Sequence, residues 1–308
     1  MTRRLRFGVL GAAWIANVAM LPAIGEAANA EVVALASRDG ARARALAERH
    51  GVPRSCEGYD GVLEDPNVDA VYVALPNGEH HPWTLRALAA GKHVLCEKPL
   101  ACTTAEGEEM VAAAGRAGRV LMEAVMYRFH PRMRAFAARA RHVSHLQATF
   151  AFPLRKDGDP RLDADLGGGA LLDVGCYCAD VARWLLGEPD RVGAVAHPLD
   201  GGVDLACIAS LSFPNGALAS LCCSFESPEH QELVVAGSEG VERLERPFTA
   251  WRDPDDPYRL TVEAFADAVA RGEPAPLSNE SSLANLRLLD RIRAAAGFAG
   301  ARRRAGLS

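Results

Sequence analysis

The chain has 308 residues and a formal net charge of −5, with 49% hydrophobic and 24% charged residues. These fractions are typical of a globular protein of one or two domains, and they exclude a disordered or coiled-coil chain. A mildly acidic composition without a sustained basic stretch argues against binding of nucleic acid. No apolar run approaches the ~18 residues that a membrane span needs, so no membrane partner is expected.

The eight cysteines do not suggest a disulfide framework or a metal site. No C-x-x-C pair is present, and a chain of this length does not need cross-links to fold. Cys176 and Cys178 have no histidine at zinc-binding spacing. The arginines and apolar residues at the N-terminus resemble a secretory signal, but Gly8 and Gly11 interrupt the run. We therefore expect reduced thiols in a cytoplasmic protein.

The first 123 residues alternate between short apolar runs and helical patterns, which is typical of a parallel sheet covered on both faces. We predict strands over residues 4–10, 31–37, 69–75, 93–96 and 120–123. We predict one helix from residue 13, a second ending near residue 50, and two more over residues 82–90 and 104–117. An α/β doubly wound sheet over residues 1–123 is the expected N-terminal domain.

The pattern changes after residue 124, where alternating strands and separate helices favour an α+β domain over residues 124–308. Helices are predicted over residues 131–141, 170–186, 259–270 and 282–296. Strands are predicted over residues 147–152, 203–213, 217–225 and 232–236. Asn215-Gly216 between two alternating runs is a strong hairpin signal, so we expect a mostly antiparallel open sheet.

The turn after the first strand carries a dinucleotide-binding pattern, in which Gly11 follows a strand and precedes a helix. The helix N-terminus can face a pyrophosphate, so Gly11, Ala13, Trp14 and Ile15 are candidate cofactor contacts. Ala13 replaces the glycine that lets the backbone approach phosphate. An ordinary strand–helix turn is the structural alternative.

The end of the second strand favours NADP over NAD. An NAD site usually places an acidic residue there to bind the ribose hydroxyls, whereas this chain has Ser37 and Arg38. A hydroxyl and a guanidinium suit the additional phosphate of NADP. Asp39 follows directly, and it either caps the next helix or binds a ribose.

Two other strand ends of the predicted sheet carry polar motifs, Leu75-Pro76-Asn77 with His80 beyond it, and Glu97-Lys98-Pro99. Ligands of open α/β sheets bind at the carboxyl ends of the strands. Lys98 is one of only three lysines among 34 basic residues. Pro99 favours extended geometry at Lys98, and the bond between them is a candidate for the cis form. We interpret Lys98 as functional rather than as a surface lysine.

The predicted helix over residues 170–186 carries Asp173, Tyr177 and Asp180 at helical spacing on one face. Two carboxylates and a phenol on an otherwise apolar helix are costly unless they are satisfied or functional. Gly175 inside the helix indicates close packing at that position. A satisfied buried network is the structural alternative to a functional site.

These motifs together resemble the Gfo/Idh/MocA family of NAD(P)-dependent oxidoreductases over nearly the whole chain. Met122-Glu123-Ala124 and residues 127–131 add to the resemblance. The family implies an N-terminal Rossmann domain and a C-terminal α+β domain whose open sheet forms a homodimer or homotetramer contact. Tyr177, where many members carry histidine, is similar to the branch of glucose–fructose oxidoreductase, xylose and dihydrodiol dehydrogenases and deoxysugar 3-ketoreductases.

The resemblance implies hydride transfer between NADP and a carbinol or carbonyl carbon of a sugar, cyclic polyol or dihydrodiol. Tyr177 or Lys98 would move the hydroxyl proton, and Lys98 would lower the pKa of Tyr177. Asp173 would orient a substrate hydroxyl, and Arg128 and Arg161 are further substrate-side candidates. The remaining cofactor contacts would be Leu75, Pro76, Asn77, His80 and Glu97, with Asn77 and Glu97 beside the nicotinamide ribose.

Two other functions remain open from the sequence. The same fold occurs in regulatory proteins that sense a sugar or a dinucleotide without catalysis, and in glycosidases whose bound nicotinamide cycles internally. The intact set of Lys98, Asp173 and Tyr177 favours an enzyme.

Overall fold

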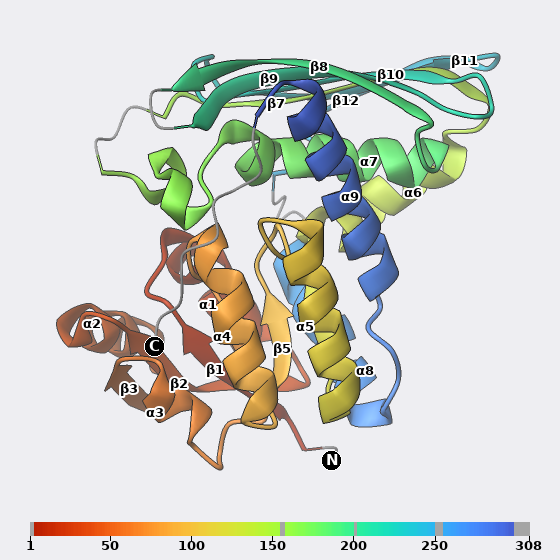
Figure 1. Ribbon diagram of the computed structural model, residues 1–308. Helices are drawn as coiled ribbons and strands as arrows, with labels where there is room; N and C mark the ends of the chain where they lie inside the picture. The colour runs from red at the N-terminus through yellow and green to blue at the C-terminus, as the bar shows by residue number, and fades with distance from the viewer. Residues whose placement is uncertain (1–2, 155–157, 200–201, 250–254, 299–308) are drawn as a thin grey trace.

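The computed structural model describes residues 3–154, 158–199, 202–249 and 255–298. Two six-stranded sheets lie at opposite ends of the molecule, with helices between and beside them (Figure 1). The N-terminal sheet has the order β3-β2-β1-β4-β5-β6 and is parallel throughout. This order is that of a dinucleotide-binding Rossmann sheet, as predicted.

The elements of the N-terminal half are short, and its central strands are buried on both faces. The strands are β1 (Leu5–Leu10), β2 (Ala30–Ser37), β3 (Arg54–Glu57), β4 (Ala70–Val73), β5 (His93–Cys96) and β6 (Leu121–Glu123). The helices are α1 (Leu21–Glu26), α2 (Gly40–His50), α3 (Asp60–Leu63), α4 (Asn77–Ala89) and α5 (Thr104–Ala117), and a π-helix (Ala16–Met20) leads into α1.

The second sheet has the order β12-β11-β7-β10-β9-β8 and is antiparallel except for the β7–β10 pair. Its strands are β7 (Val143–Ala151), β8 (Arg191–Leu199), β9 (Val203–Ser212), β10 (Leu218–Ser224), β11 (His230–Gly237) and β12 (Gly240–Glu245). Helices α6 (Pro131–Arg139), α7 (Cys176–Leu186) and α9 (Asn279–Ala295) lie on one side of this sheet, and its other face is open (Figure 1).

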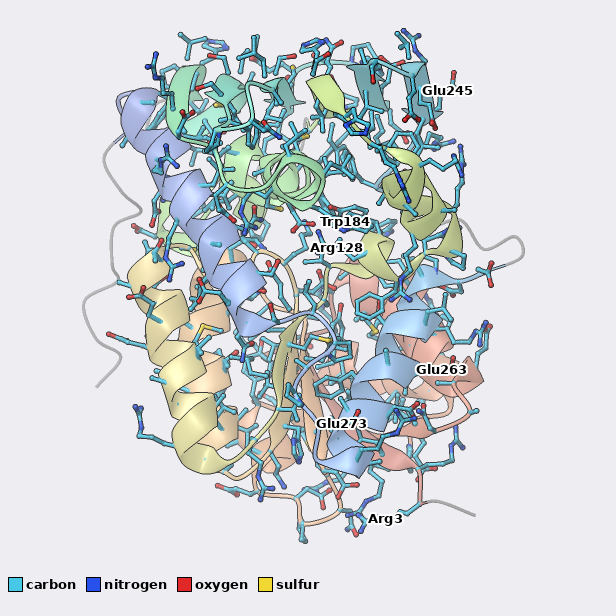
Figure 2. The ribbon with its side chains drawn as sticks, turned by 90° about the vertical axis from the view of Figure 1, so that its right-hand side faces the viewer. Arg3, Arg128, Trp184, Glu245, Glu263 and Glu273 are labelled. Atoms are coloured by element: carbon cyan, nitrogen blue, oxygen red, sulfur yellow. The ribbon has the colours of Figure 1, made fainter. Side chains whose placement is uncertain are left out.

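Helix α8 (Pro257–Arg271) returns from the second half of the chain to the first sheet. The ring centroid of Phe265 lies 5.8 Å from that of Phe7 on β1, and the Asn29 amide donates to Asp267 at 2.7 Å. Figure 2 shows α8, on which Glu263 is labelled, beside the first sheet. A single division of the chain at residue 123 therefore stays a prediction.

The sequence analysis missed three edge strands, the short helix α3 and two breaks in helices. The helix predicted from residue 13 is divided into a π-helix (Ala16–Met20) and α1. β3, β8 and β12 are edge strands of their sheets, and their polar or small residues lack the apolar pattern of a buried strand. The helix predicted over residues 170–186 is divided into a π-helix (Leu171–Gly175) and α7. Otherwise the predicted strands and helices are present, with ends that differ by a few residues.

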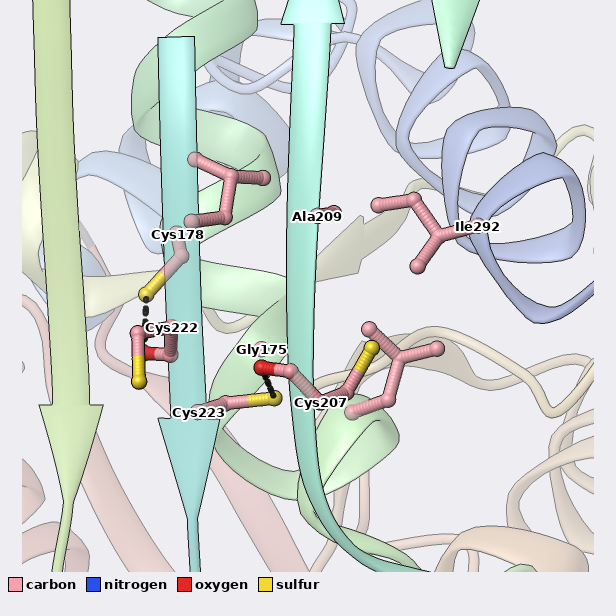
Figure 3. A pocket seen from close by; sticks show the side chains of 9 residues that line it. Gly175, Cys178, Cys207, Ala209, Cys222, Cys223 and Ile292 are labelled. Atoms are coloured by element: carbon pink, nitrogen blue, oxygen red, sulfur yellow. Dashed lines mark hydrogen bonds between the residues drawn. The ribbon is translucent and has the colours of Figure 1, made fainter. Parts of the chain in front are cut away.

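All eight cysteines are free thiols, as the composition indicates. A small pocket between α7 and the second sheet is lined by Gly175 and four of them, Cys178, Cys207, Cys222 and Cys223 (Figure 3). Burial raises the pKa of the Cys178 thiol well above its usual value, so this thiol packs as an apolar group. None of the described helices is long and apolar enough to cross a membrane.

Candidate active site

Lys98 joins the two halves of the chain at the carboxyl end of β5. Its ammonium Nζ donates to the Asp173 backbone oxygen at 2.7 Å and to the Asp173 carboxylate at 2.9 Å. The same nitrogen lies 5.1 Å from the ring centroid of Tyr177. The Lys98–Pro99 bond is cis. The three residues expected to carry the chemistry are therefore side by side, although 75 residues separate Lys98 from Asp173.

Two buried carboxylates hold the turn that carries Lys98. Glu97 accepts hydrogen bonds from the Tyr72 hydroxyl at 2.6 Å and from the Lys98 N–H at 3.2 Å. Glu123, at the end of β6, accepts from the Leu100 N–H at 2.9 Å. Burial raises the pKa of Glu97, and it raises that of Glu123 to about 7. Glu97 therefore lies behind the turn, where it fixes the backbone of Lys98.

His80 lies under the same turn with no exposed surface. Its Nδ1 is 2.8 Å from the Pro99 oxygen, and its Nε2 is 2.9 Å from the Leu75 oxygen. Burial lowers its pKa to about 4, so the ring is neutral at pH 7 and holds one proton. The structure thus places His80 beneath the predicted cofactor loops, where it supports them from below.

A local change of helix type places Asp173 and Tyr177. Asp173 lies on the π-helix, and Tyr177 lies in the first turn of α7. π-Helical turns are rare and frequently occur at functional sites. A Cβ atom at Gly175 would lie 3.0 Å from the Cys223 sulfur and 2.9 Å from the Leu171 side chain. Close packing therefore requires glycine there, as the sequence indicated.

Asp180 does not join Lys98, although it follows Tyr177 by less than one turn. The Tyr127 hydroxyl donates to its carboxylate, and the guanidinium of Arg128 lies 3.5 Å from it. Asp180 is buried in this network, so the structural alternative holds for this residue. Of the three residues predicted to share one helix face, Asp173 and Tyr177 lie at the site and Asp180 lies in the core.

Tyr177 is buried among aromatic rings, with 7% of its surface exposed. Its ring centroid lies 5.6 Å from that of Phe150 and 5.5 Å from that of Phe248. The only hydrogen-bonding atom recorded near its hydroxyl among the described residues is the Met126 sulfur, at 4.0 Å. A thioether is a weak acceptor, so this hydroxyl remains available to a stronger one.

The two key groups both keep their protons. Burial raises the pKa of Tyr177 well above its usual value. Burial alone would lower the pKa of Lys98, but Asp173, Cys176 and Glu97 together outweigh it, and the pKa stands above its usual value. The expectation that Lys98 lowers the pKa of Tyr177 is therefore wrong, because loss of water around the phenol outweighs the ammonium.

The two arginine candidates occupy different places. Arg161 forms an ion pair with Asp159 at 2.9 Å, and its guanidinium lies 3.8 Å from the Asp173 carboxylate, beside the site. Arg128 lies with its guanidinium 4.1 Å from the ring centroid of Trp184, further along α7 (Figure 2). Arg161 is therefore brought to Asp173, whereas Arg128 is held by Trp184 and Asp180.

The turn after β1 has the geometry of a dinucleotide site. Gly11 has φ +111°, and a Cβ atom there would lie 2.2 Å from the Ala74 backbone oxygen. A helix begins at Trp14, directly after the turn, and the first N–H groups of a helix can bind an anion. Trp14 beside them is 75% exposed. These features fit a pyrophosphate, and Ala13 and Ile15 flank Trp14 on the same turn.

At the end of β2, Asp39 has the first of the two roles that the sequence left open. Its carboxylate accepts from the Ala41 N–H at 2.9 Å and from the Arg42 N–H at 3.1 Å, so it caps α2. Ser37 is buried, and Arg38 is exposed. The Arg42 guanidinium reaches across to donate to the Ala12 oxygen at 3.0 Å, beside the glycine turn.

Arg42 is a candidate that the sequence analysis missed. Arg42 is far from Gly11 along the chain, so no local sequence pattern predicts its contact with the glycine turn. Its position in the first turn of α2, after the end of β2, is the one signal that could have indicated this contact. Asn77 is the first residue of α4, and its amide donates to the Gly167 oxygen at 2.9 Å. The loop over residues 159–169 therefore contacts the Leu75-Pro76-Asn77 motif.

A Rossmann sheet with a lysine–aspartate pair at its carboxyl edge defines a dinucleotide-dependent enzyme. Residues 5–125 match the oxidoreductase family with an NAD-binding Rossmann fold, and residues 142–242 match the GFO/IDH/MocA C-terminal domain. The chain belongs to the Gfo/Idh/MocA family of oxidoreductases, as the motifs indicated.

Relatives of known activity cover nearly the whole chain. D-xylose 1-dehydrogenase (NADP(+)) 2 of Haloferax volcanii is 39% identical and covers 94% of this chain and 96% of its own. A dTDP-3,4-didehydro-2,6-dideoxy-α-D-glucose 3-reductase of Streptomyces violaceoruber is 40% identical and covers 96% of each chain. The crystal structure of KijD10, a 3-ketoreductase from Actinomadura kijaniata in complex with NADP and TDP-benzene, matches with a TM-score of 0.90 and 36% identity. It covers 95% of this chain and 98% of that chain.

Proposed function

We propose that this oxidoreductase transfers a hydride between NADP and a carbinol or carbonyl carbon of an uncharged sugar or cyclic polyol. The observation that carries the proposal is the position of the Lys98 ammonium, 2.9 Å from the Asp173 carboxylate and 5.1 Å from the Tyr177 ring, at the edge of a Rossmann sheet. The xylose dehydrogenase and deoxysugar reductase relatives support the reaction class.

The residues around the β1 and β2 ends fit NADP. When bound, the nicotinamide supplies or accepts the hydride. The open helix start would hold the pyrophosphate, and Ser37, Arg38 and Arg42 would surround the adenosine phosphate. Asp39 caps α2 through one carboxylate oxygen, and the hydroxyl and guanidinium of Ser37 and Arg38 before it support NADP over NAD.

Tyr177 is the proton donor in this proposal, and Lys98 is the residue that fixes Asp173. A buried phenol with only a thioether beside it can donate to a substrate oxygen without first breaking a strong hydrogen bond. Both groups hold their protons at neutral pH, which favours reduction of a carbonyl over deprotonation of an alcohol. Asp173 and Glu97 are held by their own hydrogen bonds and keep Lys98 in place.

The charges around the site favour an uncharged substrate. Among the residues that the structure describes, each cation named here has a carboxylate partner: Lys98 pairs with Asp173, Arg161 with Asp159, and Arg128 with Asp180. These pairings leave less positive charge to attract a diphosphate on the substrate. A sugar or polyol instead needs hydroxyl partners and an apolar wall, which Phe150 and Phe152 offer.

The test is a substrate panel followed at the nicotinamide absorbance with NADP and NAD in parallel. Aldoses, cyclic polyols, keto-sugars, a dihydrodiol and a dTDP-linked keto-sugar cover the family's chemistry. We expect turnover of an uncharged sugar or polyol with preference for NADP. Tight NADPH binding without turnover of any compound would instead support a sensing protein, and sugar release without net NADPH consumption would support a glycosidase.

We also propose that the enzyme is cytoplasmic and associates with a second copy through the open face of the second sheet. Free thiols at all eight cysteines are consistent with a reducing compartment. Four large apolar side chains are more than half exposed on strands of that sheet: Val195, Ile208, Leu218 and Val241. Burial of such a group of residues between two copies would remove them from water.

A further inference from the structure

Asp204, at the start of β9, reaches from the second sheet to the segment that carries Asp173. Its Oδ2 accepts a hydrogen bond from the Leu171 N–H at 2.7 Å, although 33 residues separate the two along the chain. Leu171 is the first residue of the π-helix Leu171–Gly175. Ala170 precedes it, and a methyl group cannot accept a hydrogen bond. The carboxylate of Asp204 therefore caps this helix from another element.

The second oxygen of the same carboxylate lies against Gly169. A Cβ atom at Gly169 would lie 2.2 Å from the Asp204 Oδ1, and the residue has φ +121°. Only glycine fits this position, so the carboxylate packs directly on the backbone. Burial raises the pKa of Asp204, whereas the hydrogen bond from the Leu171 N–H lowers it. Folding thus removes this carboxylate from water and places it on one short segment of backbone.

The segment that Asp204 contacts sets the position of Asp173. The Gly169 oxygen accepts from the Asp173 N–H at 3.0 Å, and the Gly169 N–H donates to the Arg161 oxygen at 2.9 Å. Asp173 in turn accepts from the Lys98 ammonium through both its backbone oxygen and its carboxylate. A shift of the helix start would move both of these oxygens away from Lys98.

We propose that Asp204 is a positioning residue, which fixes the start of the π-helix and thereby holds the Asp173 carboxylate on Lys98. The proposal rests on the oxidoreductase function proposed above, since Asp173 is the residue expected to orient a substrate hydroxyl. The role needs an acceptor oxygen at one place, beside the Leu171 N–H. An amide of the same length can therefore replace the carboxylate, and a longer acid cannot.

Three substitutions separate the position of the acceptor from its charge. D204N keeps an oxygen that can accept from the Leu171 N–H and removes the charge. D204E keeps the charge, but its additional methylene pushes the carboxylate against Gly169, where a Cβ atom already has no room. D204A removes the acceptor. We expect D204A and D204E each to raise the KM of the sugar and to lower kcat, both about tenfold. We expect D204N to stay within about threefold of the wild-type protein in both constants.

Two controls separate positioning from a general loss of stability. Ser278 caps α9 through the Ser281 N–H at 3.2 Å on an exposed surface, so S278A also removes one helix cap. It should lower the melting temperature and leave KM and kcat unchanged. In a D173A background, D204A should not raise KM further, because its effect on KM acts through Asp173. The NADPH Kd should change less than about twofold in all variants at position 204, since the β1 and β2 ends are untouched.

Crystal structures of D204A and D204N with NADPH show the position of Asp173 without any turnover, and D204E takes the place of D204A if the latter does not fold. We expect the contact between Lys98 and the Asp173 carboxylate to be lost in D204A and kept in D204N. An Asp173 that stays on Lys98 in D204A overturns the proposal. Wild-type constants in D204A or D204E also overturn it, as does a D204N protein as impaired as D204A.

Failure of the proposed function is a different result, because the wild-type protein would then turn over no sugar or polyol. The crystal structures of the variants would still decide whether Asp204 holds Asp173 on Lys98.

Discussion

At the scale of single residues, the site depends on the partners that charged side chains find when folding removes them from water. Lys98 is half-buried, and the Asp173 carboxylate 2.9 Å away favours its charged form. Lys92, another of the three lysines, is buried, and its ammonium donates to the backbone oxygens of Asp65 and Val68. Both lysines that the structure describes therefore hold fixed partners: Lys98 contacts Asp173 at the site, and Lys92 binds two backbone oxygens of one loop.

Substitution of the two proton-bearing groups should remove turnover and spare cofactor binding. We expect K98A and Y177F each to lower kcat by about two to four orders of magnitude, because Y177F removes the proton donor and K98A releases Asp173 beside it. NADPH binding, measured by fluorescence titration, should change less than tenfold. Near-normal kcat in both variants would show that the assigned roles are wrong.

Glu123 should make stability depend on pH. Burial raises its pKa in the folded chain to about 7, compared with about 4.5 in the unfolded chain, so between these values the folded chain keeps a proton that the unfolded chain has lost. The contribution of Glu123 to the unfolding free energy therefore falls as pH rises from about 4.5 to about 7, by roughly 2–3 kcal/mol.

The measurement is the melting temperature of the wild-type protein and of E123Q across pH 5 to 8. Glutamine keeps an oxygen that can accept from the Leu100 N–H, and it does not titrate. We expect the E123Q protein to gain stability relative to the wild-type protein as pH rises. A constant difference between the two proteins over this range would mean that Glu123 ionises with an ordinary pKa.

At the scale of elements, glycines and π-helical turns shape both sides of the site. The π-helix Ala16–Met20 follows the dinucleotide turn, and the π-helix Leu171–Gly175 carries Asp173. Each precedes an α-helix, so the irregular turn lies at the end of the helix that faces the site. Helical spacing alone therefore does not determine which side chains meet there.

The glycine turn should tolerate no side chain. We expect G11A to destabilise the protein and to abolish NADPH binding, because the new methyl group would collide with the Ala74 backbone oxygen at a position with φ +111°. G25A is the matched control, since nothing lies within 4 Å of a Cβ atom at that helical position. It should leave binding unchanged and alter stability by less than about 1 kcal/mol. Melting curves and calorimetry check both variants.

At the scale of the whole molecule, the two sheets are joined by helices that cross between them. Helix α8 packs on the first sheet, although it follows the last strand of the second. Helix α9 contacts α5 and α7, and its Asn285 donates to the Cys176 oxygen at 3.1 Å. Because these helices pack against elements of both halves of the chain, they hold Lys98 of the first half next to Tyr177 of the second.

The open face of the second sheet should carry the contact between copies. We expect I208K to shift the protein from dimer or tetramer toward monomer in sedimentation experiments, because it places a charge among Val195 and its apolar neighbours. E48K, an exposed change on α2, is the control and should not alter assembly. A wild-type protein that is monomeric at micromolar concentration would contradict the proposed assembly.

The sequence by itself determined the two sheets, the family and the residues that meet at the site. Gly11, Lys98, Asp173 and Tyr177 could be found because each stands in a local pattern: a turn after a strand, a proline after a lysine, a helical repeat. Local sequence patterns predict local structure. Because parallel strands all end at the same edge of the sheet, residues that follow different strands are brought close together there.

Only the tertiary structure decided what each polar group does once water is removed. In the folded chain Asp173 pairs with Lys98, and Asp180 accepts from Tyr127. Burial raises the pKa of Tyr177, and Arg42 contacts the glycine turn. Such partners come from segments far apart in the chain. Their energies depend on distance and burial, and neither quantity is written in the order of the residues.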